Sequence, residues 1–204
     1  MEYRAVRNRC AAILDSLSLP ISQSDAMAVL NQNGFRVVEE TNLVALARRC
    51  IGTSRYRRGA KPSEAPAVVD CSSFTKWLYG QRGIWLPRRS IQQRELGEPI
   101  PLENVAAEDL IFVSGKVDYY ITDPADGVGH VGIASGENTV IHAANKKTGV
   151  IETPLHQFIE KNMFRGARRY IPKNKEVLTF ETPPEREIEI AGDLQWVILQ
   201  SLPQ

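Results

Sequence analysis

Apolar residues recur at helical spacing through the first 80 residues of the chain. Four segments show them every three or four positions, the period of a helix with one buried face: 4–17, 24–30, 42–51 and 68–80. Ser24 or Asp25 is expected to cap the second segment. In the fourth segment, Asp70 is the natural N-cap and Gly80 the expected end. The first part of the chain is therefore predicted to be mainly helical.

From about residue 108 the pattern changes to alternation of apolar and polar residues, which predicts strands. Strand patterns occupy 109–113, 130–134, 139–143, 149–152 and 166–171, with a short earlier one at 35–38. Helices followed by antiparallel strands indicate an α+β domain, here at 42–172. A helical extension is expected before it, at 1–41. In the C-terminal extension, 173–204, segments 176–182 and 186–190 are expected to pair as a β-hairpin.

Composition and charge narrow the class of protein. Apolar residues make up 43% and charged residues 24% of the 204, an ordinary globular mixture. The formal net charge is +1, so neither nucleic acid nor an anionic membrane is an implied partner. No stretch approaches the roughly 18 apolar residues that span a bilayer, and the charged N-terminus lacks a secretory pattern. We therefore expect a cytoplasmic protein with no membrane span.

The cysteines are Cys10, Cys50 and Cys71, an odd number at wide spacing that indicates neither a disulfide framework nor a structural zinc site. Cys10 and Cys50 lie inside amphipathic patterns and are expected in the core. Cys71 follows Asp70 in the first turn of a predicted helix, where the helix dipole and free N–H groups are expected to lower the thiol pKa. Cys71 is therefore a candidate nucleophile, and a small buried core cysteine is the alternative.

Two histidines lie on consecutive predicted strands. His130 opens the strand after Gly129, and a neutral imidazole there can take a thiol proton near pH 7. His142 would face it directly if the hairpin loop were 135–137, with Gly136 in the left-handed position, whereas an even loop would point the two to opposite faces. If both histidines lay on the same face, His142 would hydrogen-bond one ring nitrogen of His130 and fix its tautomer.

Cys71, His130 and His142 together occur in the order expected of papain-type chemistry. A metal site formed by the same three residues is the alternative, but no further cysteine or acid has recognisable ligand spacing.

These residues and their surroundings resemble the NlpC/P60 cell-wall peptidases. The resemblance covers about residues 42–172, and its short motifs stand in family order: Asp70-Cys71-Ser72-Ser73-Phe74, Gly83-Ile84-Trp85-Leu86-Pro87-Arg88-Arg89-Ser90, Glu108-Asp109-Leu110-Ile111-Phe112, Gly129-His130-Val131-Gly132-Ile133, Val140-Ile141-His142-Ala143-Ala144 and Gly166-Ala167-Arg168-Arg169-Tyr170. The resemblance implies a papain-like α+β fold, no cofactor, and cleavage of peptidoglycan stem peptides, usually between γ-D-glutamate and a diamino acid.

The same resemblance assigns roles to residues. It implies Cys71 as nucleophile, His130 as base, His142 as the third polar residue, and Tyr56 as the family tyrosine near the nucleophile, where its hydroxyl would assist the oxyanion. Three further residues match positions that hold a substrate's free N-terminal amine in members that cut short peptides: Asp70, Ser72 and Ser90. The alternatives are an N-cap for the aspartate and ordinary turn hydroxyls for the serines.

The chain departs from the family pattern at several points. Arg58-Gly59-Ala60 stands in place of the family Trp-Gly-Gly, and Ser73 in place of a glycine. The segment 60–69 is longer than usual, and an insertion at about 114–127 precedes the base. Both segments are expected to border the cleft and to reshape substrate binding.

Several functions fit these residues. The main expectation is a cysteine peptidase acting on peptidoglycan-derived peptides, for instance in recycling. A toxin or phage hydrolase delivered by another machine, a papain-like acyltransferase, and a non-catalytic module that binds cell-wall peptides are the alternatives. The intact Cys71, His130 and His142 weigh against the last, and no protein partner is specified.

Overall fold

The computed structural model describes residues 2–160 and 163–203, and the chain divides into two compact units. The central unit consists of Asn42–Leu78 and Leu86–Ile171. The terminal unit consists of Met1–Thr41, Tyr79–Trp85 and Pro172–Gln204. Within the described residues, no helix has both the length and the apolar character needed to cross a membrane.

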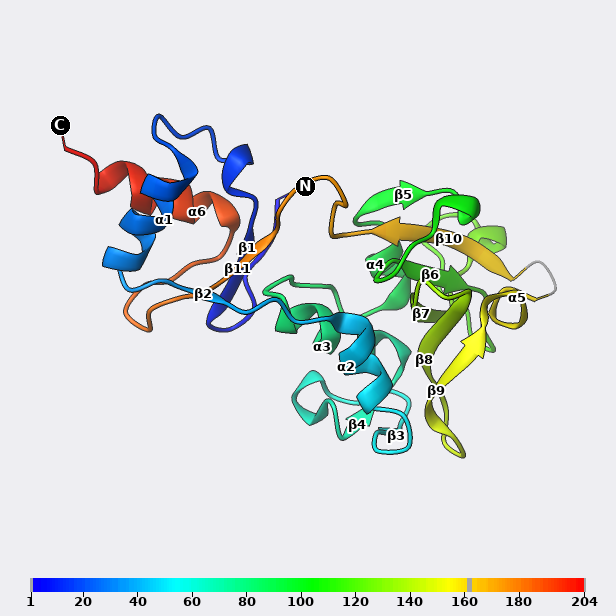
Figure 1. Ribbon diagram of the computed structural model, residues 1–204. Helices are drawn as coiled ribbons and strands as arrows, with labels where there is room; N and C mark the ends of the chain where they lie inside the picture. Colours follow the sequence, from blue (N-terminus) through cyan, green and yellow to red (C-terminus); the bar gives the residue numbers. More distant parts are fainter. Residues whose placement is uncertain (1, 161–162, 204) are drawn as a thin grey trace. The chain divides into compact units, whose positions relative to one another are not determined.

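An antiparallel sheet of six strands frames the central unit (Figure 1). Its order is β5-β10-β6-β7-β8-β9, so β6 to β9 lie side by side in chain order. The strands are β5 (Glu98–Ile100), β6 (Leu110–Val113), β7 (His130–Ala134), β8 (Thr139–Asn145), β9 (Gly149–Pro154) and β10 (Phe164–Arg169). The five strand patterns predicted after residue 108 are thus confirmed. Strand β5 was not predicted, because it is short and contains Pro99.

Short helices and a small ribbon complete the central unit. The helices are α2 (Leu43–Arg49), α3 (Cys71–Gln81), α4 (Ser90–Arg94) and α5 (Leu155–Phe158), and the two-stranded parallel ribbon joins β3 (Arg55–Tyr56) to β4 (Val68–Val69). All four residues of β6 are buried, so both faces of the sheet are covered there. One apolar cluster of the sheet includes Ile111, Val140, Phe158 and Ala167. Removing this apolar surface from water stabilises the sheet that carries the two histidines.

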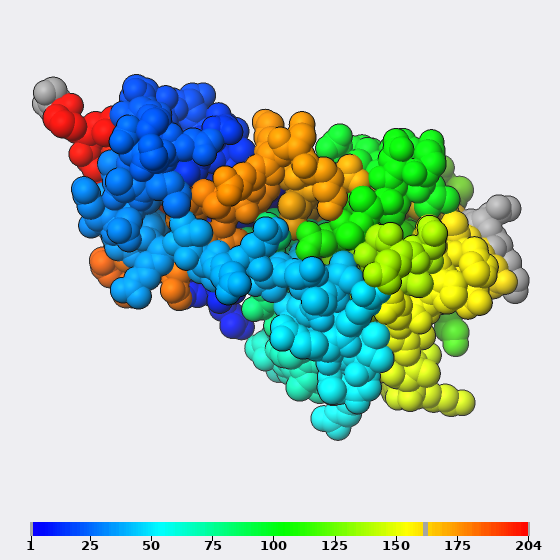
Figure 2. Space-filling view, viewed as in Figure 1, coloured from blue at the N-terminus to red at the C-terminus, as the bar shows by residue number. Residues whose placement is uncertain are grey.

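The terminal unit joins the two ends of the chain. Strands β1 (Arg9–Ala12), β11 (Leu178–Glu181) and β2 (Arg36–Val38) form an antiparallel sheet in that order. Helices α1 (Gln23–Gln32) and α6 (Ala191–Gln200) lie side by side near it (Figure 1). In the space-filling view, the blue N-terminal and orange to red C-terminal segments lie against each other (Figure 2). Their core includes Cys10, Leu30, Phe180, Leu194 and Ile198.

The predicted helix at 4–17 is wrong. Residues 9–12 form strand β1, which pairs with β11, and only Leu14–Ser16 form a short 3₁₀ turn. Cys10, Ala11 and Ala12 are all fully buried, so both faces of the strand are covered. A continuous apolar run of this kind has the same appearance in the sequence as one turn of a buried helix, and the partner strand lies about 170 residues away in the chain.

The predicted C-terminal hairpin is also wrong. Strand β11 pairs with β1 and β2, and in the segment 186–190 the structure has only an isolated bridge between Arg4 and Ile190. Helix α6 follows and buries Leu194, Val197 and Ile198. The two terminal extensions therefore belong to one α+β unit. Of the helices predicted for 1–41, the structure has only α1 as an α-helix among the described residues.

Two predicted helix ends also differ from the structure. Ser22, and neither Ser24 nor Asp25, caps α1, since its hydroxyl accepts the backbone N–H of Asp25 at 3.2 Å. Gly80 lies inside α3, and Gly83, with φ +68°, forms the turn that follows. Only the second glycine adopts the left-handed backbone conformation that ends helices.

Candidate active site

All seven residues singled out in the sequence line one cleft of the central unit. Its volume is about 1110 Å³, which is large enough for a short peptide. Tyr56, Asp70, Cys71, Ser72, Ser90, His130 and His142 all contribute to its wall. Within the described residues, no group of three His, Cys, Asp or Glu side chains is arranged to hold a metal ion. The cleft therefore brings one thiol and two imidazoles together.

Cys71 begins helix α3 because Asp70 caps it. The Asp70 carboxylate accepts the backbone N–H of Ser73 at 2.8 Å, as an N-cap does. Cys71 is partly exposed, whereas Cys10 and Cys50 are buried, as predicted for the two core cysteines. Of the three thiols, only that of Cys71 therefore reaches the cleft.

The expectation of a lowered pKa for Cys71 is wrong. Burial, followed by the charge of Asp70, raises the pKa of the thiol to about 11, although the backbone groups of Val131 and Ser72 and the Arg88 guanidinium oppose the rise. Desolvation of the thiolate outweighs the favourable helix N-terminus. The Cys71 thiol is therefore neutral near pH 7, and it would need a base to act as a nucleophile. The backbone contact with Val131 places the thiol beside the first residues of β7.

His130 and His142 share a face of the sheet, as the odd-loop prediction required. Ile133 pairs with Ile141 and Ala134 with Val140, and the backbone N–H of Ser135 bonds Thr139, so the loop is 136–138 and not 135–137. Gly136 has φ +86°, as predicted. The shift of one residue in the loop places His142 opposite Gly132, so that His130 lies diagonally from it.

The absence of a side chain at Gly132 makes room for the diagonal contact. A Cβ atom there would lie 2.4 Å from a methyl carbon of Val140 and 3.1 Å from Cβ of His142. The Nε2 atom of His130 lies 2.8 Å from Nδ1 of His142. The two rings meet edge to face, with centroids 4.9 Å apart.

A third member extends this chain of polar contacts. Nε2 of His142 lies 2.9 Å from the hydroxyl oxygen of Thr153, on strand β9. If His130 is to accept a proton at Nδ1, its Nε2 must donate to Nδ1 of His142, and His142 must then donate from Nε2 to Thr153. The hydroxyl of Thr153 can accept this bond, so the contacts permit the one tautomer pair that leaves Nδ1 of His130 as a base.

Burial keeps both imidazoles neutral. It lowers the pKa of His130 to about 4, and burial together with the neighbouring His130 lowers the pKa of His142 to about 3. The Phe158 ring contributes to this apolar environment, with its centroid 5.6 Å from that of His130 and 4.8 Å from that of His142. A neutral imidazole accepts a proton, so His130 is in the state that a general base requires near pH 7.

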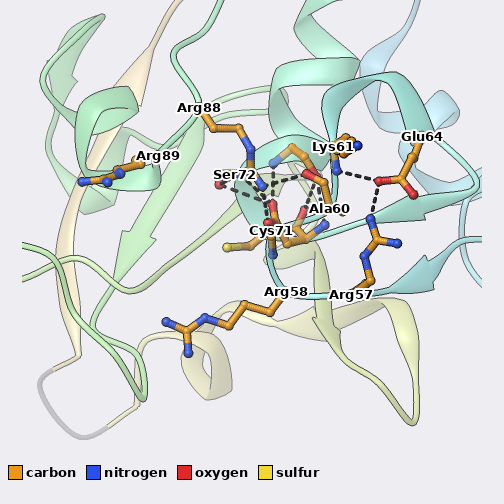
Figure 3. Close-up of polar contacts among 12 residues, drawn as sticks. Arg57, Arg58, Ala60, Lys61, Glu64, Cys71, Ser72, Arg88 and Arg89 are labelled. Atoms are coloured by element: carbon orange, nitrogen blue, oxygen red, sulfur yellow. Dashed lines mark hydrogen bonds and ion pairs between the residues drawn. The ribbon is translucent and has the colours of Figure 1, made fainter.

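Asp70 has a partner of opposite charge in the cleft. Arg88 forms an ion pair with its carboxylate and donates to the Ser72 hydroxyl at 2.9 Å and to the carbonyl of Ala60 at 2.8 Å (Figure 3). The backbone N–H of Gly59 also donates to Asp70, at 2.9 Å. Both carboxylate oxygens are therefore occupied by donors, which fixes the loop before α3.

Tyr56 and Ser90 occupy other parts of the wall. The β3–β4 ribbon aligns Tyr56 with Val69, two residues before Cys71, which explains why the tyrosine lies near that thiol. Burial, followed by the charges of Cys71 and Asp70, raises the pKa of Tyr56, so its hydroxyl keeps its proton and remains a donor. Ser90 is buried and begins α4.

Sequence reasoning missed Thr153 and Arg88 as members of the site. Thr153 lies one residue beyond the predicted strand 149–152, and only the register of β8 with β9, which pairs His142 with Ile151, brings it to the ring. Arg88 belongs to a quoted motif, but no spacing rule joins a loop arginine to Asp70, 18 residues earlier.

Comparison with known proteins decides the family. A family model described as the NlpC/P60 family matches residues 52–169, which is more than half of the chain and includes every site residue named above. The chain belongs to the NlpC/P60 family. Its α+β fold is that of NlpC/P60 domains: it matches the domain of the peptidoglycan hydrolase SagA with a TM-score of 0.50 and 28% identity, over 63% of this chain and 96% of that one.

Curated relatives of this NlpC/P60 protein include peptidases of bacteria. A "Probable endopeptidase" of Corynebacterium glutamicum is 39% identical over 55% of this chain and 47% of its own length. The "Gamma-DL-glutamyl hydrolase" of Bacillus subtilis is 28% identical over 76% and 39%, and the "Gamma-D-glutamyl-L-lysine dipeptidyl-peptidase" of Bacillus cereus is 35% identical over 50% and 29%. The chain thus spans about half or less of the length of these relatives.

Proposed function

We propose that this protein is a cysteine peptidase that hydrolyses an amide bond in peptidoglycan stem peptides, with the γ-D-glutamyl bond to a diamino acid as its target. The observation that carries the proposal is the shared cleft of Cys71, His130 and His142, in which His142 occupies one ring nitrogen of His130. Two relatives are named for γ-glutamyl hydrolysis, which supports the choice of bond.

In the first half of the reaction, His130 acts as a general base through Nδ1. It takes the proton of the neutral Cys71 thiol while the sulfur attacks the amide carbon. The oxyanion that forms is stabilised by the backbone N–H of Cys71 at the helix N-terminus and by the Tyr56 hydroxyl. The resulting imidazolium then protonates the leaving amine, the C–N bond breaks, and a thioester remains on Cys71.

In the second half, water hydrolyses the thioester. His130, neutral again, takes a proton from the water as its oxygen attacks the thioester carbon, and it returns that proton to the departing sulfur. His142 and Thr153 hold the His130 ring in the productive tautomer throughout. The products are a free carboxylic acid, a free amine and the restored thiol.

The experiment is incubation with defined tripeptide and tetrapeptide stems that contain the γ-D-glutamyl–lysine bond, followed by mass analysis. We expect two products per substrate from the wild-type protein and none from Cys71→Ala, with the circular dichroism spectrum unchanged. Full turnover by Cys71→Ala would refute the nucleophile, and an intact set of stems would refute the substrate class. An added amine that appears in the product would instead identify an acyltransferase.

A role for Asp70, Ser72 and Ser90 in holding a free N-terminal amine is part of the same proposal, and stems with free and acetylated amines test it. Because Arg88 neutralises Asp70, we expect a modest preference for the free amine.

That the protein acts in the cytoplasm stays a prediction, and so does the alternative that it is a toxin delivered by another machine. The rival function, a binding module, predicts stem binding without any product.

A further inference from the structure

Tyr119, in the insertion at 114–127, contacts two arginines of the cleft wall. Its hydroxyl accepts a hydrogen bond from Arg58 at 3.4 Å. Its ring lies 5.3 Å from the guanidinium carbon of Arg89, a cation–π contact. All three residues line the same cleft as Cys71.

The insertion is fixed where it carries Tyr119. Asp118 accepts hydrogen bonds from the Ser114 hydroxyl and the Gly115 backbone, both at 2.6 Å. The backbone of Tyr119 forms a pair of hydrogen bonds with Val128, at 3.0 and 2.8 Å. The far end is also held, since Asp126 forms an ion pair at 2.9 Å with the buried Arg94. The aromatic ring is therefore positioned by the backbone of the insertion.

Arg58 and Arg89 differ from the arginines next to them in sequence. Arg57 forms an ion pair with Glu64, and Arg88 with Asp70. Arg58 and Arg89 are exposed, and among the described residues neither forms an ion pair with a carboxylate. In the close-up, the side chains of Arg58 and Arg89 extend away from the hydrogen bonds that join Arg88 to Ser72 and Ala60 (Figure 3).

We infer that Arg58, Arg89 and Tyr119 form a carboxylate-binding site that selects substrates of the neighbouring thiol. A guanidinium group binds a carboxylate through charge-assisted hydrogen bonds, and two of them without an internal acid favour an external one. The Tyr119 hydroxyl accepts its bond from Arg58, and its O–H group can donate to the same anion. This inference rests on the proposed hydrolysis of γ-glutamyl peptides.

The chemistry of that substrate supplies the anion. A γ-glutamyl bond uses the side-chain carboxyl of glutamate, so its α-carboxylate stays free a few bonds from the scissile carbon. The leaving diamino acid carries a second carboxylate when it ends the peptide. The site also joins two departures from the family pattern, since Arg58 replaces a tryptophan and Tyr119 belongs to the insertion, and the two side chains touch.

The test combines enzyme variants with substrate variants. The substrates are a tripeptide stem with the γ-D-glutamyl–L-lysine bond, the same peptide with the glutamyl α-carboxyl converted to a carboxamide, and the same peptide with a C-terminal amide. The enzymes are wild type, Arg58→Gln, Arg89→Gln and the double variant. Arg57→Gln is the matched control, because it removes the same charge from an arginine that does not line the cleft.

We expect wild type and Arg57→Gln to cleave the acid about tenfold faster in kcat/KM than one of the two amides, the usual scale for one charged hydrogen bond. The double variant should cleave acid and amide at equal rates, close to the wild-type rate on the amide. The amide that shows the effect identifies which carboxylate is bound. Equal rates of wild type on all three substrates, or unchanged selectivity in the double variant, would overturn the inference while leaving the peptidase intact.

Calorimetric binding separates this result from a failure of the proposed reaction. The inactive Cys71→Ala protein is titrated with the same three peptides, with and without the two arginine substitutions. Affinity about tenfold lower for one amide than for the acid supports the site even when no peptide is cleaved, provided that the arginine-substituted protein shows no such difference. Equal affinity for all three peptides counts against it.

Discussion

The Nε2 atom of His130 lies 2.8 Å from Nδ1 of His142, although the two residues are not direct partners across the hairpin. Gly132, the residue opposite His142, has no side chain to keep the rings apart. The contact occupies Nε2 of His130 and leaves Nδ1 as the nitrogen that can serve Cys71. The register of one hairpin thus decides which nitrogen of His130 remains available to the thiol.

Thr153→Val tests whether the threonine sets the tautomer of His142. Valine has nearly the same shape but cannot accept the hydrogen bond from Nε2, so His142 can place its proton on Nδ1 and turn a donor toward His130. We expect kcat on a stem peptide to fall about tenfold with KM unchanged.

Thr153→Ser should restore the activity, and Thr148→Val, on the exposed turn before β9, should have no effect. Nitrogen NMR of the histidine rings should show a change of tautomer at His142 in Thr153→Val alone. An unchanged NMR spectrum, or an increased KM with an unchanged kcat, would exclude this role for the hydroxyl.

Gly132→Ala tests the space between the histidines. The new Cβ would lie 2.4 Å from a Val140 methyl carbon, which forces the two strands to shift. Overpacking of this kind destabilises a protein by about 1–3 kcal/mol, and here we expect a loss of kcat as well, because His142 moves.

Gly80→Ala is the matched control for this substitution. Its Cβ would meet only ordinary contacts, inside helix α3, so we expect unchanged or slightly higher stability and unchanged activity. Chemical denaturation and stem-peptide turnover measure both variants. Wild-type turnover in Gly132→Ala would show that the diagonal contact tolerates a side chain.

Alkylation of the native protein by iodoacetamide should modify Cys71 and spare the buried Cys10 and Cys50. Because the thiolate is the reactive form and burial raises the pKa of Cys71 to about 11, the rate should climb steadily from pH 7 toward pH 10. Peptide mapping by mass spectrometry locates the label, and Cys71→Ala should remain unlabelled. A plateau below pH 7 would instead reveal a preformed thiolate–imidazolium pair.

The two histidines should make the protein less stable in acid. Their pKa values fall from 6.5 in the unfolded chain to about 4 for His130 and about 3 for His142. Below pH 6.5 the unfolded chain therefore binds more protons than the folded one, and the free energy of unfolding decreases as the pH falls toward 4. Above pH 6.5 this contribution is constant.

Urea unfolding of wild type, His130→Gln and His142→Gln at pH 7.5 and pH 4.5 measures this effect. Carboxylates contribute equally to all three proteins, so the difference between them isolates the imidazoles. We expect the free energy of unfolding to decrease less between pH 7.5 and pH 4.5 in each variant than in wild type. Equal losses would show that the rings are protonated as easily in the folded protein as in the unfolded chain.

Local pattern was sufficient for much of the central unit. Alternation identified β6 to β10, and the N-cap at Asp70 placed Cys71 at the start of a helix, because caps and side-chain periods act over a few residues. In the terminal unit it found α1, β2 and the segment of β11, but it failed for β1, which pairs with β11 across nearly the whole chain. Pairing at that separation depends on burial that no short window contains.

The nucleophile candidate and the two histidines could be read from the sequence alone, because each lies in a recognisable local pattern. Their common face depended on whether the hairpin loop has an odd number of residues, and the strand register of the fold shows that it does. Three properties of the site come from the folded chain alone: Thr153 holds His142, Arg88 neutralises Asp70, and burial raises the thiol pKa. These properties depend on which segments meet and on how much water they exclude. Both are results of packing between residues far apart in the chain.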